Sequence, residues 1–449
     1  DRSSAGLRPT PNPPFFPYAP LQMAPSARQL LIVVAAHLLG LAAGGPPEAG
    51  AFEAFLREHG KSYAPGSAEY QQRRRLFERR RREIEGHNAQ PGQLWTARVN
   101  RLADFTDEEL GQLRNYRRQA QRPQEAAAPA QFLSRSRKAV SLAHLPQDFN
   151  WQHLTAMREV QDQGGCGSCW AFASSTALRA HSELFQADRE FSVQEIVSCT
   201  PNPMQCGGDG GCKGATAELA MEYVMQHGCA TAGERPYHGD DGACPTAAAG
   251  GQSLVGGQAP AQLQAAGGAA FGMTGYRKLP ENQLEPVLLA LYELGPVAVS
   301  VAAGYRWNFY HGGIMSACSQ NAVIDHAVTL VGYGRDPLFG VKYYLIQNSW
   351  GKHWGENGFI RLFRHDDEQE RSHCGWDNQP QIGSGCNGGP PRVRICGSCG
   401  ILYDAVVPKM ALSPQGLWAR SGQKQPDSSD TLLSLLRNST RRPSRARFH

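Results

Sequence analysis

Apolar residues recur at helical spacing in two parts of the chain. The first part begins with AFEAFLREHGKSY and extends over residues 51–113, where a long charged stretch carries Phe77 and Ile84 on one face. The second is CWAFASSTALRAHSELF, residues 169–185. Because one face of a helix repeats about every 3.6 residues, this spacing predicts helices in both parts.

Shorter apolar runs predict strands. The runs GPVAVSVAA (residues 295–303) and HAVTLVGYG (residues 326–334) are rich in Val and bounded by Gly, as strands commonly are. Residues 146–408 as a whole are rich in Gly and Cys and mix both kinds of pattern. We therefore expect helices and strands together in this region.

Three segments lack a core-forming pattern. Residues 114–143 are rich in Arg, Gln and Ala and predict a linker. Residues 246–270 are a low-complexity Ala/Gly/Gln run, which predicts a surface insertion. The tail, residues 411–449, is expected to be disordered and includes an N-glycosylation sequon at Asn438.

The amino-terminal region predicts secretion. After Met23 come one Arg, an apolar stretch over residues 30–43 and then small residues, which is typical of a signal peptide over residues 23–43, cleaved after Ala42 or Ala43. A transmembrane helix is the alternative, but it needs roughly 20 apolar residues. We interpret residues 1–22 as an upstream translated segment.

Composition and charge add little to this picture. The chain has 449 residues and is 41% hydrophobic, enough for at least two domains. The net charge of +5 is concentrated in the runs 73–85 and 437–449. No aromatic residues alternate with these basic runs, so we interpret them as solvated faces and predict no nucleic-acid partner.

The cysteines predict a disulfide-bonded domain. All 12 lie between Cys166 and Cys399, and with a signal peptide this indicates an oxidising compartment. The tetrapeptide CGSC occurs twice, at residues 166–169 and 396–399. Such a pair can be a redox pair, half of a zinc site, or a disulfide cysteine beside a nucleophile.

The first CGSC stands next to residues suited to nucleophilic catalysis. Cys169 opens the predicted helix, and the helix dipole favours a thiolate there. His326 could form the ion pair with that thiolate, and Asn348 could orient the imidazole behind the shield of Trp350. Gln163 offers a side-chain N–H for an oxyanion, together with the backbone N–H of Cys169.

These motifs resemble a papain-family cysteine protease of the cathepsin L branch. The resemblance rests on QDQGGCGSCWAF, DHAVTLVGYG and NSWGKHWGENGFIRL. His326 and Asn348 lie 157 and 179 residues after Cys169. Without the 25-residue insertion at 246–270 these separations become 132 and 154, close to the roughly 130–150 residues typical of the family.

The resemblance extends to the leader region. Residues 69–88 match the helix pattern of papain-like propeptides, although Arg80 stands where that pattern has Asn. Residues 100–110, NRLADFTDEEL, match the next motif with Leu102 in place of an aromatic residue. A propeptide of this type inhibits its own enzyme, and we expect acid to release it by protonating its carboxylates. The matching positions in the helix are Glu69, Arg73, Phe77, Ile84 and Asn88.

The implied fold class is α+β. It is a two-lobed papain-like fold, in which a helical lobe carries Cys169 and a β-barrel lobe carries His326 and Asn348, with the active site in the cleft between them. The implied domains are a helical inhibitory propeptide with its linker over residues 44–143 and a catalytic domain over residues 144–410.

The resemblance also implies disulfides between Cys166 and Cys212, Cys199 and Cys244, and Cys318 and Cys399. Both CGSC copies would then serve different purposes, and neither would bind zinc. The other cysteines leave their pairing open. We expect a Cys206–Cys229 bond and a bridge between two of the last three, with one thiol left over; these three are Cys374, Cys386 and Cys396.

Substrate preference is expected to depend on the pocket for the second residue before the scissile bond. By resemblance its walls are Ser300 and Ala327, with Asp404 at the floor, where a carboxylate could pair with a substrate Arg. If Asp404 instead turns to solvent, Phe should be preferred. Gly214 and Ala215 should lie beside the extended substrate, where the family usually has two glycines.

The implied protein is a cysteine endopeptidase that acts as a monomer on proteins and peptides. Its own propeptide is an expected intramolecular partner, and we predict no cofactor, no metal and no membrane association of the mature form. The resemblance places it in the secretory pathway, in a lysosome, an acidic vacuole or outside the cell. The alternatives are a catalytically inactive papain-like binding protein, or a propeptide that acts alone as an inhibitor or polyanion-binding segment.

Overall fold

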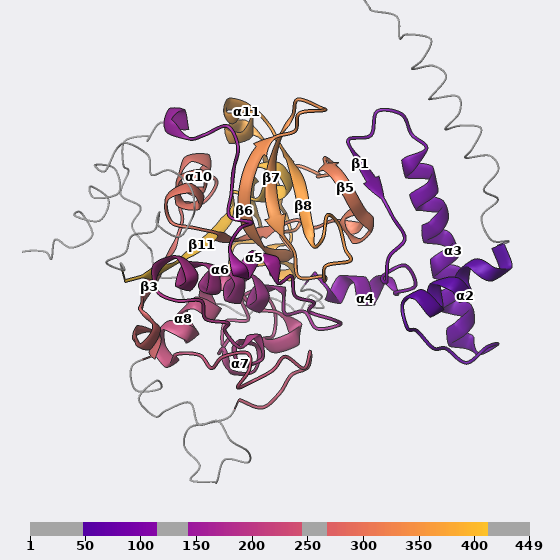
Figure 1. Cartoon of the computed structure of the whole chain (residues 1–449), viewed down its shortest axis with the longest axis horizontal. Coiled ribbons are helices and arrows are strands. Elements are labelled where there is room, and N and C mark those ends of the chain that lie inside the picture. The colour runs from indigo at the N-terminus through magenta and orange to yellow at the C-terminus, as the bar shows by residue number, and fades with distance from the viewer. Residues whose placement is uncertain (1–47, 115–141, 245–266, 412–449) are drawn as a thin grey trace, which may run out of the picture. The chain divides into compact units, whose positions relative to one another are not determined.

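The structure is a computed structural model that describes residues 48–114, 142–244 and 267–411 (Figure 1). The signal peptide, the upstream segment, the sequon at Asn438 and most of the linker, the 246–270 insertion and the tail lie outside the described residues. Within the described ranges, no helix is long and apolar enough to cross a membrane.

The described chain divides into two units, residues 1–62 and 63–449. The first unit contains α2 (Glu48–Glu58), where the rings of Phe52 and Phe55 stack with centroids 6.1 Å apart. All other elements belong to the second unit.

The second unit contains most of the helices. The α-helices are α3 (Ala68–Asn88), α4 (Asp107–Gln112), α5 (Thr155–Arg158), α6 (Cys169–Phe185), α7 (Val193–Cys199), α8 (Ala217–His227), α10 (Leu284–Glu293) and α11 (Asp367–Ser372). Single turns of 3-10 helix are η1 (Leu142–His144), η2 (Gly211–Lys213), η3 (Gly267–Phe271), η4 (Tyr305–Phe309), η5 (Pro380–Ile382) and η6 (Ser398–Gly400).

The strands of the second unit form two sheets. The strands are β1 (Trp95–Ala97), β2 (Phe149–Asn150), β3 (Met273–Lys278), β4 (Val297–Val301), β5 (Tyr310–Met315), β6 (His326–Arg335), β7 (Lys342–Gln347), β8 (Phe359–Arg364), β9 (Cys374–Asp377), β10 (Val393–Cys396) and β11 (Asp404–Met410). The large sheet has the order β1-β5-β8-β7-β6-β4-β11-β3, with β2 on β6, and β9 pairs with β10. Among the described strands, only β5 and β8 pair in parallel, and the other pairs are antiparallel.

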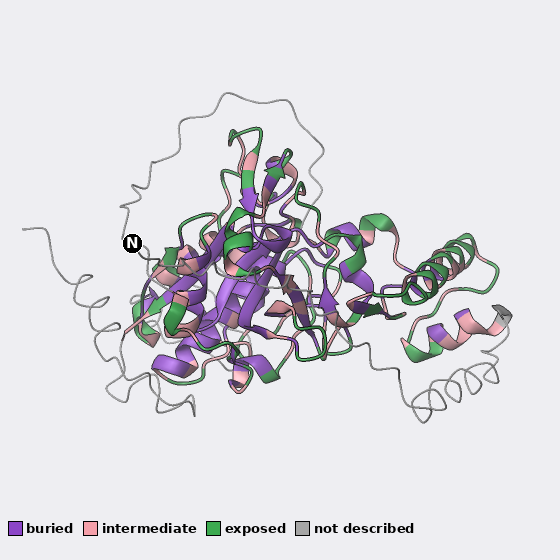
Figure 2. Cartoon of the chain, turned by 90° about the horizontal axis from the view of Figure 1, so that it is seen from above, coloured by how far each residue is buried: buried purple, intermediate pink, exposed green. Residues whose placement is uncertain are grey.

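The expected helix at residues 169–185 and the two expected strands are present. Helix α6 has the predicted bounds, and β4 and β6 fall within or on the predicted runs. Helix α6 is buried along almost its whole length and packs against β6 and α8. The buried residues of the described chain, purple in Figure 2, gather in the sheet and in the helices packed on it. The alanine-rich sequence of α6 allows this because small side chains let the helix approach the sheet closely.

The leader region is only partly helical. Helix α3 starts where the Ser67 hydroxyl accepts a hydrogen bond from the backbone N–H of Tyr70, and α4 starts at a capping box formed by Thr106 and Glu109. Between them, β1 pairs with the edge strand β5. The continuous helical pattern predicted for residues 51–113 is therefore wrong at β1, because pairing with a distant strand overrides local preference.

The expected β-barrel lobe is an open sheet. Among the described strands the pairing runs from β1 to β3 without closing into a ring. The two end strands each have a single partner, since β1 contacts β5 and β3 contacts β11. The α+β class and the propeptide-like leader remain as predicted.

Candidate active site

Cys169 is the first residue of α6 and is fully buried. Its Sγ accepts a hydrogen bond from the backbone N–H of Ala327, with 3.5 Å between the two atoms. Ala327 is the second residue of β6, directly after His326. The contact between α6 and β6 thus brings the thiol next to the residue that carries the imidazole.

His326 is held by the residue that follows β7. Its Nε2 lies 2.8 Å from Oδ1 of Asn348, and the Trp350 ring lies against the imidazole with centroids 5.0 Å apart. All three side chains are buried. Nδ1 of His326 makes no hydrogen bond with any described residue, so this nitrogen is available to exchange a proton.

Hydrogen bonds hold both the nitrogen and the oxygen of the Gln163 side-chain amide. Its Nε2 donates to the backbone carbonyls of Leu113 (3.0 Å) and Cys166 (2.8 Å), and its Oε1 accepts from the Ser349 hydroxyl (2.6 Å). An amide held in this way keeps its N–H groups directed at one place, which is what stabilisation of an oxyanion requires.

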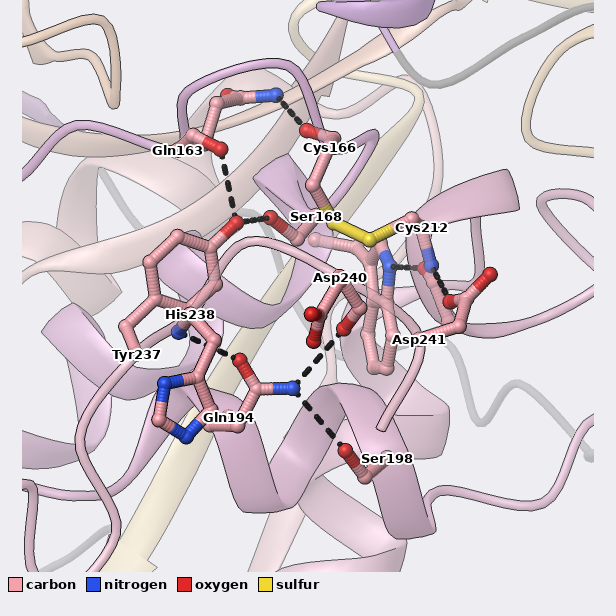
Figure 3. The surroundings of a disulfide bond; sticks show 12 residues. Gln163, Cys166, Ser168, Gln194, Ser198, Cys212, Tyr237, His238, Asp240 and Asp241 are labelled. Carbon is pink, nitrogen blue, oxygen red and sulfur yellow. Dashed lines mark hydrogen bonds between the residues drawn. A yellow bond between two sulfur atoms is a disulfide. The ribbon is translucent and has the colours of Figure 1, made fainter. Parts of the chain in front are cut away.

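A tyrosine connects Gln163 with the residue that precedes the nucleophile candidate (Figure 3). The Tyr237 hydroxyl donates to the Gln163 backbone carbonyl at 2.8 Å and lies 2.7 Å from the Ser168 hydroxyl. The same view shows the Cys166–Cys212 disulfide beside this chain of hydrogen bonds. These contacts hold the segment before Cys169 in one conformation.

Residues of the leader cover the site. The Leu113 carbonyl accepts a hydrogen bond from Nε2 of Gln163, and the Arg114 guanidinium lies 3.3 Å from the carboxylate of Asp325. Further contacts join Arg101 to Asp162, with 2.6 Å between nitrogen and oxygen. The leader therefore accepts a hydrogen bond from the Gln163 amide, the expected oxyanion donor.

Burial opposes ionisation of both the thiol and the imidazole in the covered site. Burial raises the pKa of Cys169 to about 12, more than the hydrogen bond from Ala327 lowers it. Burial also lowers the pKa of His326 to about 4, against the opposing effect of Asn348. The sequence predicted a thiolate–imidazolium pair, but loss of hydration outweighs the helix dipole while the leader is in place.

The expected floor of the substrate pocket is already paired. Asp404 is only 3% exposed; it accepts a hydrogen bond from the Ser300 hydroxyl at 2.7 Å, and Lys278 lies 3.2 Å from its other oxygen. Lys278 also lies 3.0 Å from Glu218. The register of β4 places Ser300 opposite both Asp404 and Ala327, so Asp404 does not turn to solvent.

Electrostatics maintain this pairing. Burial by itself would raise the pKa of Asp404, but the Lys278 charge and the Ser300 hydroxyl outweigh it and lower the pKa. Burial raises the pKa of Glu218, and the charge of Asp404 adds to that rise. No sequence pattern pointed to Lys278, because it lies 126 residues from Asp404 and approaches it only through β3–β11 pairing.

Gly214 and Ala215 follow η2, whose Cys212 is bonded to Cys166 beside the site. Ala215 is buried. The other contacts that sequence reasoning missed are those of Ser349, Tyr237, Leu113 and Arg114; only Ser349 has a sequence signal, as the residue after Asn348.

The disulfides correct one expectation. The structure joins the three pairs that the resemblance implied, Cys166–Cys212, Cys199–Cys244 and Cys318–Cys399, and also Cys374–Cys396 and Cys206–Cys386. The predicted Cys206–Cys229 bond is wrong. Cys229 packs as a free thiol in the core beneath α7 and α8, whereas Cys206 lies in a loop that contacts the segment around Cys386.

Comparison with known proteins agrees with this geometry. Residues 145–390 match the family model described as "Papain family cysteine protease", and residues 52–110 match "Cathepsin propeptide inhibitor domain (I29)". Cathepsin J of Rattus norvegicus is 30% identical over 357 residues, which cover 76% of this chain and 94% of that protein. The senescence-specific cysteine protease SAG39 of Oryza sativa subsp. japonica is 29% identical over 331 residues, covering 73% and 88%.

Solved structures give the same result. The digestive procathepsin L2 proteinase of the Tenebrio molitor larval midgut superposes with a TM-score of 0.58 at 26% identity, covering 81% of this chain and 100% of that one. A recombinant stem bromelain precursor gives 0.59 at 25% identity, covering 81% and 99%. The chain therefore belongs to the papain family of cysteine proteases, and it carries a cathepsin-type propeptide inhibitor domain.

Proposed function

We propose that this protein is a cysteine endopeptidase precursor in which Cys169 is the nucleophile, His326 the general acid and base, Asn348 the residue that orients the imidazole, and Gln163 an oxyanion donor. The observation that carries the proposal is the set of contacts around one point. Sγ of Cys169 accepts a hydrogen bond from Ala327, which follows His326, and Nε2 of His326 lies 2.8 Å from Oδ1 of Asn348. Nε2 of Gln163 donates to the carbonyl of Leu113, which covers the site.

The chemistry follows from these positions. Once the leader is removed, water and substrate reach the site, and a proton passes from Cys169 to Nδ1 of His326. The thiolate attacks the peptide carbonyl carbon, and the resulting oxyanion is stabilised by Nε2 of Gln163 and the N–H of Cys169. His326 then protonates the leaving amine, which leaves a thioester on Cys169.

The second half restores the enzyme. A water molecule gives its proton to His326 and attacks the thioester carbon. The oxyanion collapses, the carboxylic acid product leaves, and the sulfur takes the proton back through His326. Asn348 holds the ring in one orientation throughout, because its amide accepts from Nε2 without adding a negative charge.

We further propose the order of segments in the precursor. The signal peptide would be residues 23–43, the propeptide with its linker 44–143 and the catalytic domain 144–410. Passage through the secretory pathway, to a lysosome, an acidic vacuole or the exterior, is supported by the apolar stretch 30–43 and by five disulfides.

The paired floor of the pocket suggests a substrate preference. Ser300 donates a hydrogen bond to Oδ2 of Asp404, and the Lys278 charge lies 3.2 Å from Oδ1, which accepts no hydrogen bond from the described residues. A substrate guanidinium would therefore have to compete with the Lys278 charge for Asp404. We propose that the enzyme accepts Phe or another large apolar side chain at the second position before the scissile bond, and accepts Arg poorly.

Turnover of fluorogenic dipeptides tests the proposed function. The activated protein should cleave a Phe-Arg substrate, and Cys169→Ala should abolish this cleavage. The matched control is Cys229→Ala, which removes the other buried free thiol of the described chain and should keep the activity. A folded, propeptide-free wild type that cleaves no peptide would contradict the proposal and favour a binding protein.

A further inference from the structure

A segment before β11 is tied to the helical elements by a disulfide. The antiparallel strands β9 and β10 are joined at their ends by the Cys374–Cys396 bond. The chain between them carries Cys386, which is bonded to Cys206, 180 residues earlier. We call residues 374–396 the strap.

On the helical side the strap lies along the loop between α7 and η2. The backbone N–H of Gly207 donates to the Gly385 carbonyl at 3.1 Å, and the N–H of Asn387 donates to the Met204 carbonyl at 2.8 Å. These two hydrogen bonds flank the Cys206–Cys386 disulfide. The attachment therefore involves backbone pairing as well as a covalent bond.

This attachment adjoins a residue of the substrate path. Gly207 packs so closely on Ala215 that a Cβ on the glycine would lie 2.5 Å from the Ala215 carbonyl oxygen. Ala215 and Gly214 are the residues expected beside an extended substrate. The strap is thus anchored to the back of one wall of that path.

On the other side the strap is anchored to the chain that leads into His326. The N–H of Ser384 donates to the Ile324 carbonyl at 2.9 Å, and the N–H of Ile324 donates to Oδ2 of Asp377 at 3.1 Å. Gly383 also packs closely on this chain, since a Cβ at Gly383 would lie 2.5 Å from the Ile324 carbonyl oxygen. Ile324 is fully buried.

The chain that covers the site runs toward this second anchor. Leu113 sits at Gln163, and the next residue, Arg114, pairs with Asp325, which directly follows Ile324. Ile324 is three residues before Ala327, the contact of Cys169 Sγ, so at most about 10 Å separate these two positions along the chain. An extended substrate advances about 3.3 Å per residue, so this upper limit corresponds to at most about three substrate residues.

We propose that the strap closes the substrate path on the amino-terminal side of the scissile bond, so that it determines how many substrate residues bind there. The amino-terminal side is the side of the pocket formed by Ser300 and Ala327, and the inference therefore rests on the proposed function. About three residues fit before the strap. A longer peptide gains no further contact, because the covalent bond between Cys206 and Cys386 prevents the two walls from separating.

A substrate-length series tests this proposal. Peptides with the same scissile bond and leaving group would carry two, three, four or six residues on the amino-terminal side; a second series would be extended only on the carboxyl-terminal side. The variant Cys206→Ser/Cys386→Ser opens the strap. The control Cys199→Ser/Cys244→Ser removes one disulfide within the helical elements and leaves the strap intact.

The expected pattern is specific to one side. In the wild type and the control, kcat/KM should stop rising at three amino-terminal residues, whereas in the opened variant it should rise about fivefold or more between three and six residues, because remote contacts add binding energy. The carboxyl-terminal series should be the same in all three proteins.

Two results would overturn the proposal. One is a wild-type kcat/KM that keeps rising from three to six amino-terminal residues, which needs no variant and is independent of how the variants fold. The other is an opened variant that cleaves the dipeptide normally and shows the wild-type length profile. Absence of dipeptide turnover in the wild type would instead contradict the proposed function on which the inference rests.

Discussion

The two copies of CGSC have the same four residues but differ in disulfide bonding and in the secondary structure that follows. In the first, Cys166 is disulfide-bonded and Cys169 is a free thiol that starts a 17-residue helix against β6. In the second, Cys396 ends β10 and Cys399 sits in the short turn η6 with a positive φ of 50°, and both are in disulfides. The cysteine that begins a long helix is a free thiol, whereas the cysteine in the short turn is in a disulfide, so the same four residues differ in chemical state with the element that follows them.

The largest expected difference between the copies is in activity. Cys169→Ala should lower kcat by about 10⁴-fold or more, since it removes the nucleophile. The double variant Cys318→Ala/Cys399→Ala should retain most of the kcat but lose about 2–5 kcal/mol of unfolding free energy with its disulfide. Dipeptide turnover and denaturant unfolding measure the two effects. A Cys318→Ala/Cys399→Ala protein that has the wild-type unfolding free energy but no activity would contradict this difference between the two copies.

Thiol reactivity should distinguish the precursor from the mature enzyme. Because burial raises the pKa of Cys169 to about 12 and lowers that of His326 to about 4 in the covered state, the precursor should react with iodoacetamide at pH 6 at least about 100-fold more slowly than the mature enzyme.

Mass spectrometry of alkylated peptides provides the measurement. Cys229, whose pKa burial also raises, serves as an internal control that should stay unmodified in both forms. Equal labelling of Cys169 before and after propeptide removal would show that the leader does not suppress the thiolate.

The first copy should also depend on the side-chain amide of Gln163, which donates to the Cys166 carbonyl. Gln163→Ala should lower kcat by about 100-fold with a smaller change in KM, because a donor to the oxyanion acts mainly in the transition state. The control is Gln161→Ala, a nearby glutamine that does not contact Leu113. Equal losses in the two variants would indicate a general disturbance of the loop.

Removal of Lys278 should change substrate preference. In Lys278→Ala the Asp404 carboxylate loses its ion pair, and the ratio of kcat/KM for Arg-Arg over Phe-Arg should rise about tenfold. Lys409→Ala, an exposed lysine on the same strand as Asp404, should leave the ratio unchanged. A ratio that stays constant in both variants would mean that Asp404 does not face the substrate side chain.

The smallest expected effect concerns pH. Burial raises the pKa of Asp325 to about 7 and outweighs the Arg114 charge, which lowers it; hydration after release of the leader should return the pKa toward about 4. The covered state therefore binds the extra proton, so the contribution of Asp325 to propeptide binding is complete below about pH 4 and is lost as the pH rises through 7. Asp325 thus opposes acid activation, so protonation of other carboxylates must weaken propeptide binding at low pH.

Propeptide affinity measured between pH 5 and 7 checks this sign. Asp325→Asn should remove a slope of about threefold per pH unit from the wild-type profile. Asp162→Asn, at the Arg101 ion pair, is the matched variant and should leave that slope in place. Equal processing of the precursor at pH 4.5 and pH 7 would contradict acid activation as a whole.

Local sequence determined much of the fold and the site. The periodicity of residues 169–185 is sufficient for α6, because the small and apolar residues there favour one continuous buried helix. The candidates Cys169, His326, Asn348 and Gln163 were identified from residue type and motif, since each lies beside an element whose pattern is clear. The structure brings these four together.

Contacts between segments far apart in the chain could not be predicted in this way. The pairing of β1 with β5, the ion pair of Lys278 with Asp404 and the bond of Cys206 with Cys386 join residues separated by 126 to 218 positions. No local pattern reports such a partner, because distance in space depends on the whole topology.

Chemical state was likewise decided by tertiary structure. The sequence by itself identified a thiol at the start of a helix and candidate imidazole and amide partners for it. Only the folded precursor determined that burial opposes ionisation of the thiol, that the leader accepts a hydrogen bond from Gln163 and that Asp404 is already paired. The physical reason is that hydration and charge at a buried group depend on every segment packed around it.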